Sequence, residues 1–215
     1  GWKPIEPGDV CWEDINGDNK INGLDREVVG NIFPKVTGGF SSTLSWKGIS
    51  LYARFDYALG HTLYNDLAAR TLGQYQGAFN IITEVKDMWS EDNPNSDLPA
   101  FYYADQLAKK NITRSNNASA SRHNNSSRLY EKADYLALRE LTLSWDLPKA
   151  WTSKAFIQNA SVYVTGQNLF YVTGYTGTSP EPVLTNSDNN ENLYGVDQGR
   201  YPTPRTVLFG LSVTF

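Results

Sequence analysis

The sequence lacks several residues on which common functional sites depend. Cys11 is the only cysteine, and His61 and His123 are the only histidines, so no internal disulfide and no short zinc-binding motif can form. No run approaches about 18 apolar residues, which excludes a transmembrane helix but not transmembrane strands, whose polar and apolar residues alternate. Fingerprints such as a P-loop or Gly-x-Ser-x-Gly are also missing, and we expect no enzyme activity.

The charge balance excludes one class of partner. Nineteen basic and 23 acidic residues give a net charge of -4, whereas nucleic-acid binders carry a positive footprint, so we expect no nucleic-acid partner. The first residues, GWKPIEPGDV, show no basic-then-apolar signal pattern. We interpret this in one of two ways: a targeting segment has been removed, or the chain starts within a longer protein.

Alternation of apolar and polar residues is the strongest pattern that is present. Apolar residues occupy the odd positions from Ile49 to Leu59 and again from Leu141 to Leu147, and the residues from 206 to 215 repeat the pattern. Shorter or less regular copies cover residues 39–46 and 160–170. Successive side chains of a strand point to opposite faces, so the pattern predicts about five two-faced strands.

The expected strands divide the chain into alternating strand and loop segments. The expected segments are a loop over residues 1–37, a hairpin over 38–59, a long loop over 60–134, a strand pair over 135–170, a second long loop over 171–205 and a last strand over 206–215. Lys47 and Gly48 form the hairpin turn, and residues 79–89 are expected to be helical. Short connections that alternate with long ones are typical of antiparallel barrel strands that cross a membrane.

Two all-β architectures fit these strands: a transmembrane barrel and a water-soluble sandwich. Alternation over roughly 8 to 11 residues favours the barrel, because sandwich strands usually run about 5 to 6 residues. Five strands cannot close a barrel in lipid, since open edges would leave backbone groups unpaired. We therefore predict that the chain is part of a larger antiparallel transmembrane β-barrel with long extracellular loops.

The polar face of one strand carries two charged residues. Arg54 and Asp56 alternate with apolar residues of the hairpin, at positions where a barrel lumen is expected. We expect them to form a structural ion-pair network with neighbouring strands, for example with Glu140.

The segment DINGDNKINGLD has the ligand spacing of an EF-hand loop. With Asp14 at position 1, the expected ligands are Asp14, Asn16, Asp18, the carbonyl of Lys20, Asn22 and Asp25. Two departures are Asn19 in place of the glycine at position 6 and Asp25 in place of the glutamate at position 12. The spacing predicts a structural calcium ion that braces a loop; a metal-free loop of Asx turns is the alternative.

Four motifs together resemble the C-terminal region of SusC/RagA-family, TonB-dependent outer-membrane transporters. They are PGDVCWEDINGDNKIN followed by DREVVGNIFPKVTGGF, then SSRLYEKADYLALRELTLSWDLPK, then SVYVTGQNLFYVTGYTGTSPE, and finally YPTPRTVLFGLSVTF. The resemblance covers nearly the whole chain. The terminal Phe215 also resembles the C-terminal aromatic residue of outer-membrane barrels.

The resemblance implies a fold, a function and partners. A complete member is a plugged 22-stranded barrel, and its plug and TonB-contacting segment are absent from this sequence. A SusD-like lipoprotein covers the extracellular mouth, and the complex imports oligosaccharides, or less often peptides, across the outer membrane of a Gram-negative bacterium with energy from TonB. Residues 1–37, 60–134 and 171–205 then face outward, and the apolar faces contact outer-membrane lipid.

The alternative function is that of a secreted, calcium-braced β-sandwich that binds glycans at the cell surface.

Overall fold

The structure is a computed structural model that describes residues 6–69, 71–72, 82–100, 126–182, 184–186 and 192–215. It divides into two compact units, each considered by itself. The strand unit contains residues 31–61, 132–182 and 200–215, and the loop unit contains residues 1–30, 62–131 and 183–199. Among the residues that the structure describes, no helix is both long and apolar enough to span a membrane.

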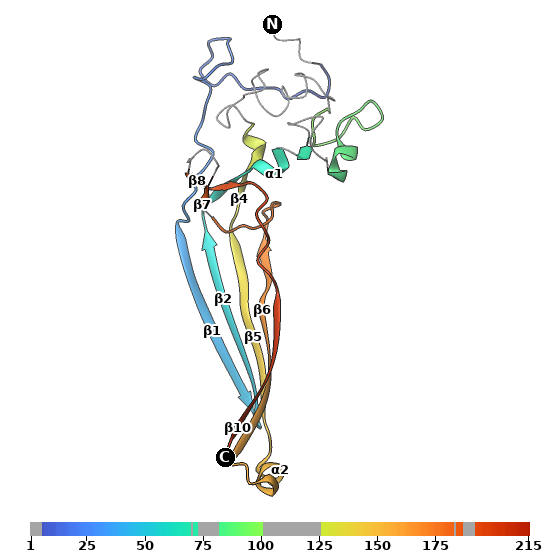
Figure 1. The fold of residues 1–215 in the computed structure, drawn as a ribbon. Coiled ribbons are helices and arrows are strands. Elements are labelled where there is room, and N and C mark those ends of the chain that lie inside the picture. The colour runs from blue at the N-terminus through green and yellow to red at the C-terminus, as the bar shows by residue number, and fades with distance from the viewer. Residues whose placement is uncertain (1–5, 70, 73–81, 101–125, 183, 187–191) are drawn as a thin grey trace. The chain divides into compact units, whose positions relative to one another are not determined.

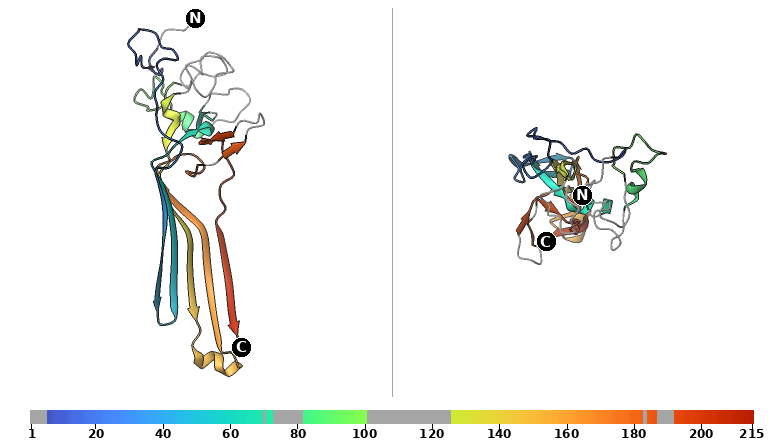
Figure 2. Two further views of the ribbon diagram at one scale, coloured as in Figure 1. Left: turned by 90° about the vertical axis from the view of Figure 1, so that its left-hand side faces the viewer. Right: turned by 90° about the horizontal axis from the view of Figure 1, so that it is seen from above.

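The strand unit is built on one antiparallel sheet of five strands, in the order β1-β2-β5-β6-β10 (Figures 1 and 2). The strands are β1 (Val36–Trp46), β2 (Ile49–Leu59), β5 (Tyr135–Asp146), β6 (Asn159–Thr173) and β10 (Thr206–Thr214). Neighbouring strands follow one another along the chain, as in a meander. The predicted all-β, antiparallel fold class is therefore confirmed.

The register of the strands collects the apolar residues on one face of the sheet. Leu44, Leu51, Leu143, Val164 and Phe209 form one continuous row across all five strands. Leu44 is 67% exposed and Phe209 is 83% exposed, although both are large apolar side chains. No second sheet covers this face within the strand unit, all of whose residues are described. The β-sandwich alternative requires such a layer, so the arrangement of this unit argues against it.

A β-bulge interrupts the alternation of β5. The pairing of β2 with β5 slips between Arg54 and Phe55, which leaves Arg139 as an extra residue on β5. Below the bulge the odd residues of β5, such as Leu141, share the apolar face, and above it the even residues, such as Leu138, do so. One inserted residue therefore reverses the facing of the upper part of this strand.

The short connections lie at one end of the sheet. Lys47 and Gly48 both have positive φ angles, 48° and 83°, and so form the two-residue type I′ turn that matches the twist of a hairpin. The link between β5 and β6 contains the helical turn α2 (Lys149–Thr152) and the 3-10 turn η6 (Ser153–Ala155). Pro148 lies between the end of β5 and this helical segment. Proline has no backbone N–H, but at the start of a helix that group would have no partner within the helix, so no hydrogen bond is lost.

The loop unit has smaller elements and its own small core. Its elements are β3 (Thr62–Asn65), α1 (Asp66–Ala69), η2 (Thr83–Asp87), η5 (Ser127–Leu129), β4 (Tyr130–Lys132) at the unit boundary, β7 (Leu184–Asn186), β8 (Asn192–Tyr194) and β9 (Val196–Asp197). Tyr64, Ala69 and Leu129 pack together in its core. The helix expected over residues 79–89 is not found as predicted: residues 79–81 lie outside the described residues, and the described part contains only the short 3-10 helix η2.

Candidate functional site

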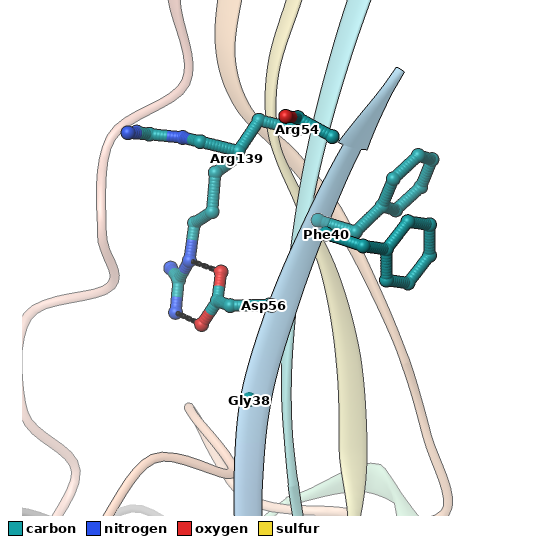
Figure 3. Close-up of a pocket in the computed structure, with 8 residues that line it drawn as sticks. Gly38, Phe40, Arg54, Asp56 and Arg139 are labelled. Atoms are coloured by element: carbon teal, nitrogen blue, oxygen red, sulfur yellow. Dashed lines mark hydrogen bonds and ion pairs between the residues drawn. The ribbon is translucent and has the colours of Figure 1, made fainter.

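The polar face of the sheet carries a cluster of charged residues around Arg139. We define the polar cluster by the residues Arg54, Asp56, Arg139, Glu140, Tyr171, Glu181 and Arg200. Figure 3 shows that Arg139 and Asp56 lie on one side of β1 and that Phe40 lies on the other side. The cluster therefore belongs to the face opposite the apolar rows.

Arg139 binds Asp56 across the β2–β5 pair. The guanidinium donates through Nε to Oδ1 and through Nη2 to Oδ2 of the carboxylate, the latter over 2.9 Å (Figure 3). Two parallel bonds of this kind fix both side chains in one plane, which a lysine could not do. The bulge is the reason that Arg139 can take part, because regular alternation would place it on the apolar face.

Glu181 joins the cluster from the segment that follows β6. Arg139 Nη2 donates to Glu181 Oε1, and Tyr171 Oη donates to the same oxygen over 2.9 Å. Arg139 Nη1 also donates to Tyr171 Oη over 2.9 Å. A single guanidinium thus satisfies two carboxylates and a phenol, while its own side chain is only 19% exposed.

The segment of residues 175–182, which we call the strap, is held to other parts of the strand unit at further points. Arg200 Nη2 donates to the backbone oxygen of Glu181 over 3.0 Å and lies 3.9 Å from its carboxylate. His61 Nε2 lies 2.8 Å from the carbonyl oxygen of Pro180, and because a carbonyl only accepts, the ring must donate this bond. His61 is fully buried, so the histidine expected in a loop is a packed part of the strap contact. His123 lies outside the described residues.

A hollow adjoins the cluster where β1 has small side chains. Its lining includes Gly38, Gly39 and Ser41 of β1 together with Arg54 and Arg139. Gly39 pairs with Asp56, and a Cβ atom there would come within 2.9 Å of the Phe55 carbonyl oxygen. Glycine therefore permits the close approach of β1 to β2 beside the ion pairs.

The cluster is balanced in charge and contains no nucleophile paired with a base. Three arginines face three carboxylates, so the arrangement can orient side chains and hold the strap but shows no catalytic constellation. The expected ion pair between Arg54 and Glu140 is present, at 3.9 Å. Arg139, Tyr171 and Glu181, which form the centre of the cluster, were not predicted from the sequence pattern.

The predicted calcium loop folds around two carboxylates at its ends. Asp14 accepts hydrogen bonds from three backbone amides, at residues 17, 18 and 19, over 2.7 to 3.3 Å. Asp25 accepts from the amides of Ile15 and Asn22, over 3.1 and 2.6 Å. The first expected ligand thus organises the first half of the loop, and the last one closes the loop through its bond with Ile15. Asn19 has a φ of 62°, the left-handed conformation for which EF-hand loops use glycine at this position.

The remaining expected ligands form a repeated local turn. The side-chain oxygens of Asn16, Asp18 and Asn22 each accept from the amide two residues later, over 2.8 to 2.9 Å. These are Asx turns. In the described part of the chain, no group of three or more His, Cys, Asp and Glu side chains is placed to hold a metal ion. Three of the six expected ligands are Asn16, Asn22 and the carbonyl of Lys20, so calcium binding stays a prediction.

The chain is similar in sequence to known receptors over nearly its whole length. It is 30% identical to TonB-dependent receptor P3 of Formosa agariphila over 213 residues, which cover 98% of this chain and 19% of the receptor. It is also 30% identical to TonB-dependent receptor P26 of the same organism, over 99% of this chain and 20% of the receptor. The chain therefore spans about a fifth of the length of these relatives. No family model matches the chain.

The chain is also similar in fold to solved structures of transporters. The RagAB peptide transporter has a TM-score of 0.61 and 27% sequence identity, over 86% of this chain and 17% of that one. The RagAB peptide importer in its closed-closed state has a TM-score of 0.62 and 27% identity, over 87% of this chain and 18% of that one.

Both comparisons lead to one class of protein, the TonB-dependent receptors and transporters. The resemblance inferred from the motifs is confirmed: in sequence and in fold, the chain corresponds to a segment of a SusC/RagA-type TonB-dependent receptor. The relatives named above are receptors and transporters rather than enzymes.

Proposed function

We propose that this chain forms part of the wall of an outer-membrane barrel that imports a solute with energy from TonB. The observation that carries the proposal is the single sheet with an exposed apolar face and a charged opposite face. A barrel wall needs both faces, because one contacts hydrocarbon and the other lines a wet interior. The relatives named as TonB-dependent receptors support the same role.

The cargo and the partners follow the same proposal. The cargo is an oligosaccharide or a peptide, and the RagAB neighbours, described as a peptide transporter, support the second alternative. A SusD-like surface lipoprotein covers the mouth, and TonB acts through a part of the receptor that this sequence does not contain. The proposal also includes an orientation in the membrane. The short links between strands lie in the periplasm, and residues 1–37, 60–134 and 171–205 lie outside the cell.

Cysteine labelling tests location and orientation in the intact receptor. In a background whose only cysteine is the introduced one, Leu24→Cys is expected to react with a membrane-impermeant maleimide on whole cells. Ser153→Cys, in the β5–β6 link, is expected to react only after permeabilisation, although both side chains are exposed. Equal labelling of both positions on whole cells would contradict the proposed orientation. Loss of cargo uptake in cells without TonB tests the transport step.

We also propose that the loop of residues 14–25 binds calcium and thereby stiffens an extracellular loop. The support is the arrangement of oxygens along the loop: Asp14 accepts from an amide inside the loop, and Asp25 joins the two ends by accepting from the amide of Ile15. A carboxylate has about four lone-pair sites. A carboxylate oxygen that accepts a hydrogen bond from one backbone amide can therefore also bind a hard cation. Calcium prefers oxygen ligands of this kind.

Asp18→Asn separates the calcium site from a metal-free loop. Asparagine can still accept from the amide of Lys20, so the turn stays intact, but one of three negative charges is removed. We expect calcium affinity to fall by roughly tenfold or more, because ligand charge tunes the affinity of such loops. Calorimetric titration of the intact receptor measures the change, with Asp92→Asn as a control outside the loop. A receptor that binds no calcium in this titration would establish the metal-free alternative.

A further inference from the structure

Arg54 is the arginine of the polar cluster with the weakest contacts. Its guanidinium lies 3.9 Å from the carboxylate of Glu140, which is beyond hydrogen-bond length, and in the described part of the chain it donates no hydrogen bond. Arg139, by contrast, donates four hydrogen bonds to its neighbours. The side chain of Arg54 is 56% exposed and that of Arg139 is 19% exposed. The N–H groups of Arg54 are therefore available to a ligand.

Asp56 lies two residues from Arg54 on the same face of β2, yet it does not pair with Arg54. Residues i and i+2 of a strand point to the same side, so this carboxylate is a natural partner for the guanidinium. Both of its oxygens instead accept from Arg139, one from Nε and the other from Nη2. Arg139 thus occupies the carboxylate that would otherwise neutralise Arg54.

The hollow beside Arg54 has room for a ligand group. Its volume is about 540 Å³, and Gly39 and Ser41 of β1 form part of its lining. Figure 3 shows that the side chain of Arg54 extends on the side of β1 where Arg139 binds Asp56. Ser41 is opposite Arg54 in the register, and its hydroxyl has no hydrogen-bond partner among the described residues. Pockets for small molecules usually have volumes of about 300 to 1,000 Å³, so one sugar or amino-acid unit fits here.

We propose that Arg54 and Ser41 bind a carboxylate group of the cargo at the wall of the barrel. The inference rests on the proposed barrel function, which turns the polar face toward the wet interior. A guanidinium can donate two parallel bonds to a carboxylate, and the serine hydroxyl can donate a third. The cargo is then acidic, and its carboxylates belong to the uronic acid units of an oligosaccharide or to the acidic side chains of a peptide. Arg139 is a positioning residue, because it keeps Asp56 away from Arg54.

Two nitroxides that differ in one group test the site. The intact receptor, with Thr43→Cys as its single cysteine, carries a bimane label two residues from Ser41 on the polar face. The nitroxide 3-carboxy-PROXYL has a carboxylate where 3-carbamoyl-PROXYL has a neutral amide. Relative to their effect on free bimane-labelled cysteine, we expect the carboxylate probe to quench this label about threefold to fivefold more strongly than the amide probe. Equal quenching by both probes would overturn the proposal.

Variants of Arg54 separate a binding site from a general effect of charge. Arg54→Gln is expected to abolish the preference for the carboxylate probe. Arg54→Lys is expected to keep only part of it, because lysine cannot form the two-bond fork. Lys149→Gln removes one positive charge from the exposed β5–β6 link and should leave the preference unchanged. A preference that survives in Arg54→Gln would show that Arg54 does not bind the probe.

Arg139→Met tests the positioning role. Asp56 is then free to pair with Arg54, so we expect the preference to fall by at least about half. Combining Arg139→Met with Asp56→Asn removes the competing carboxylate and is expected to restore the preference. A loss of stability cannot explain such a rescue, because both variants lack the bonds of Arg139. A double variant that stays as impaired as Arg139→Met would contradict the positioning role.

Competition identifies the source of the carboxylate. Tetragalacturonic acid and tetraglutamate are each added together with the carboxylate nitroxide, and the methyl ester of the first and tetraglutamine serve as neutral controls. We expect at least one acidic probe to relieve the quenching in the receptor with Arg54 and to have no effect on Arg54→Gln. If neither acidic probe relieves the quenching, or if the neutral controls do so equally, the role in cargo binding is wrong.

The failures of the inference and of the proposed function are distinguishable. In vesicles with a nitroxide at the centre of the lipid chains, bimane at Leu44→Cys, on the apolar face, should be quenched and bimane at Thr43→Cys should not. If this result holds but the carboxylate preference is absent, the inference is wrong and the proposed function stands. If Thr43→Cys is quenched from the chain centre and Leu44→Cys is not, the proposed function fails and the inference fails with it.

Discussion

Replacing Arg139 with methionine is expected to lower the free energy of unfolding of the receptor by about 2 to 3 kcal/mol. The variant leaves Asp56 and Glu181 without their shared cation, and Tyr171 keeps only part of its bonding. The penalty is below that of a fully buried pair, since the Asp56 and Glu181 side chains are 34% and 24% exposed. Denaturant unfolding in detergent micelles, followed by tryptophan fluorescence, measures the change.

Arg54→Met is the matched control. Its side chain is 56% exposed and its partner Glu140 is 3.9 Å away, so the loss should stay below about 1 kcal/mol. Arg139→Lys keeps the charge but cannot form the two-bond fork with Asp56, and we expect an intermediate loss. The strap should also become more accessible to protease in Arg139→Met. Equal, small losses for Arg139→Met and Arg54→Met would show that the cluster does not hold the strap.

Leu143→Lys is expected to lower barrel stability by about 2 to 4 kcal/mol, whereas Ser144→Lys should change it little. The two residues are adjacent on β5 but lie on opposite faces, and Leu143 pairs with Leu51 and Val164 in the apolar row. A lysine there must place its charge in hydrocarbon, and one at the lumen face stays in water. The folded fraction after refolding into vesicles measures both variants.

Depth within the membrane adds a second comparison. Leu211 lies in the same apolar row as Trp145 and Val162. This row is the next one after that of Leu143 toward the end of the sheet with the short connections. Leu211→Lys should therefore be less damaging than Leu143→Lys, because the penalty falls toward the interface. Similar folded fractions for Leu143→Lys and Ser144→Lys would contradict the assignment of the faces.

The strands were predictable because strand facing is a local property. Odd residues from Ile49 to Leu59 are apolar, and the observed register keeps them on one face of β2. The turn at Lys47 and Gly48 was predictable for the same reason, since two residues between alternating runs leave few turn types. Periodicity needs no knowledge of distant contacts.

The centre of the polar cluster depended on contacts that periodicity does not show. The stretch LALREL does contain a signal: Leu138 and Leu141 are three residues apart, with two charged residues between them. Such a slip in the alternation is what a bulge produces, and it would have placed Arg139 beside Asp56. The sequence around Glu181 contains no comparable signal. The strap approaches Arg139 only in the folded chain, 42 residues away in sequence.

The outer edges of the sheet have a consequence for how this polypeptide can exist. β1 and β10 end the strand order, and in the described part of the chain neither has a neighbour on its far side. Unpaired edge strands recruit other extended chains, and an adjoining oily surface strengthens the tendency to aggregate. The strand unit on its own is therefore expected to aggregate. We expect it to be stable and monodisperse only where further strands pair with both of its edges.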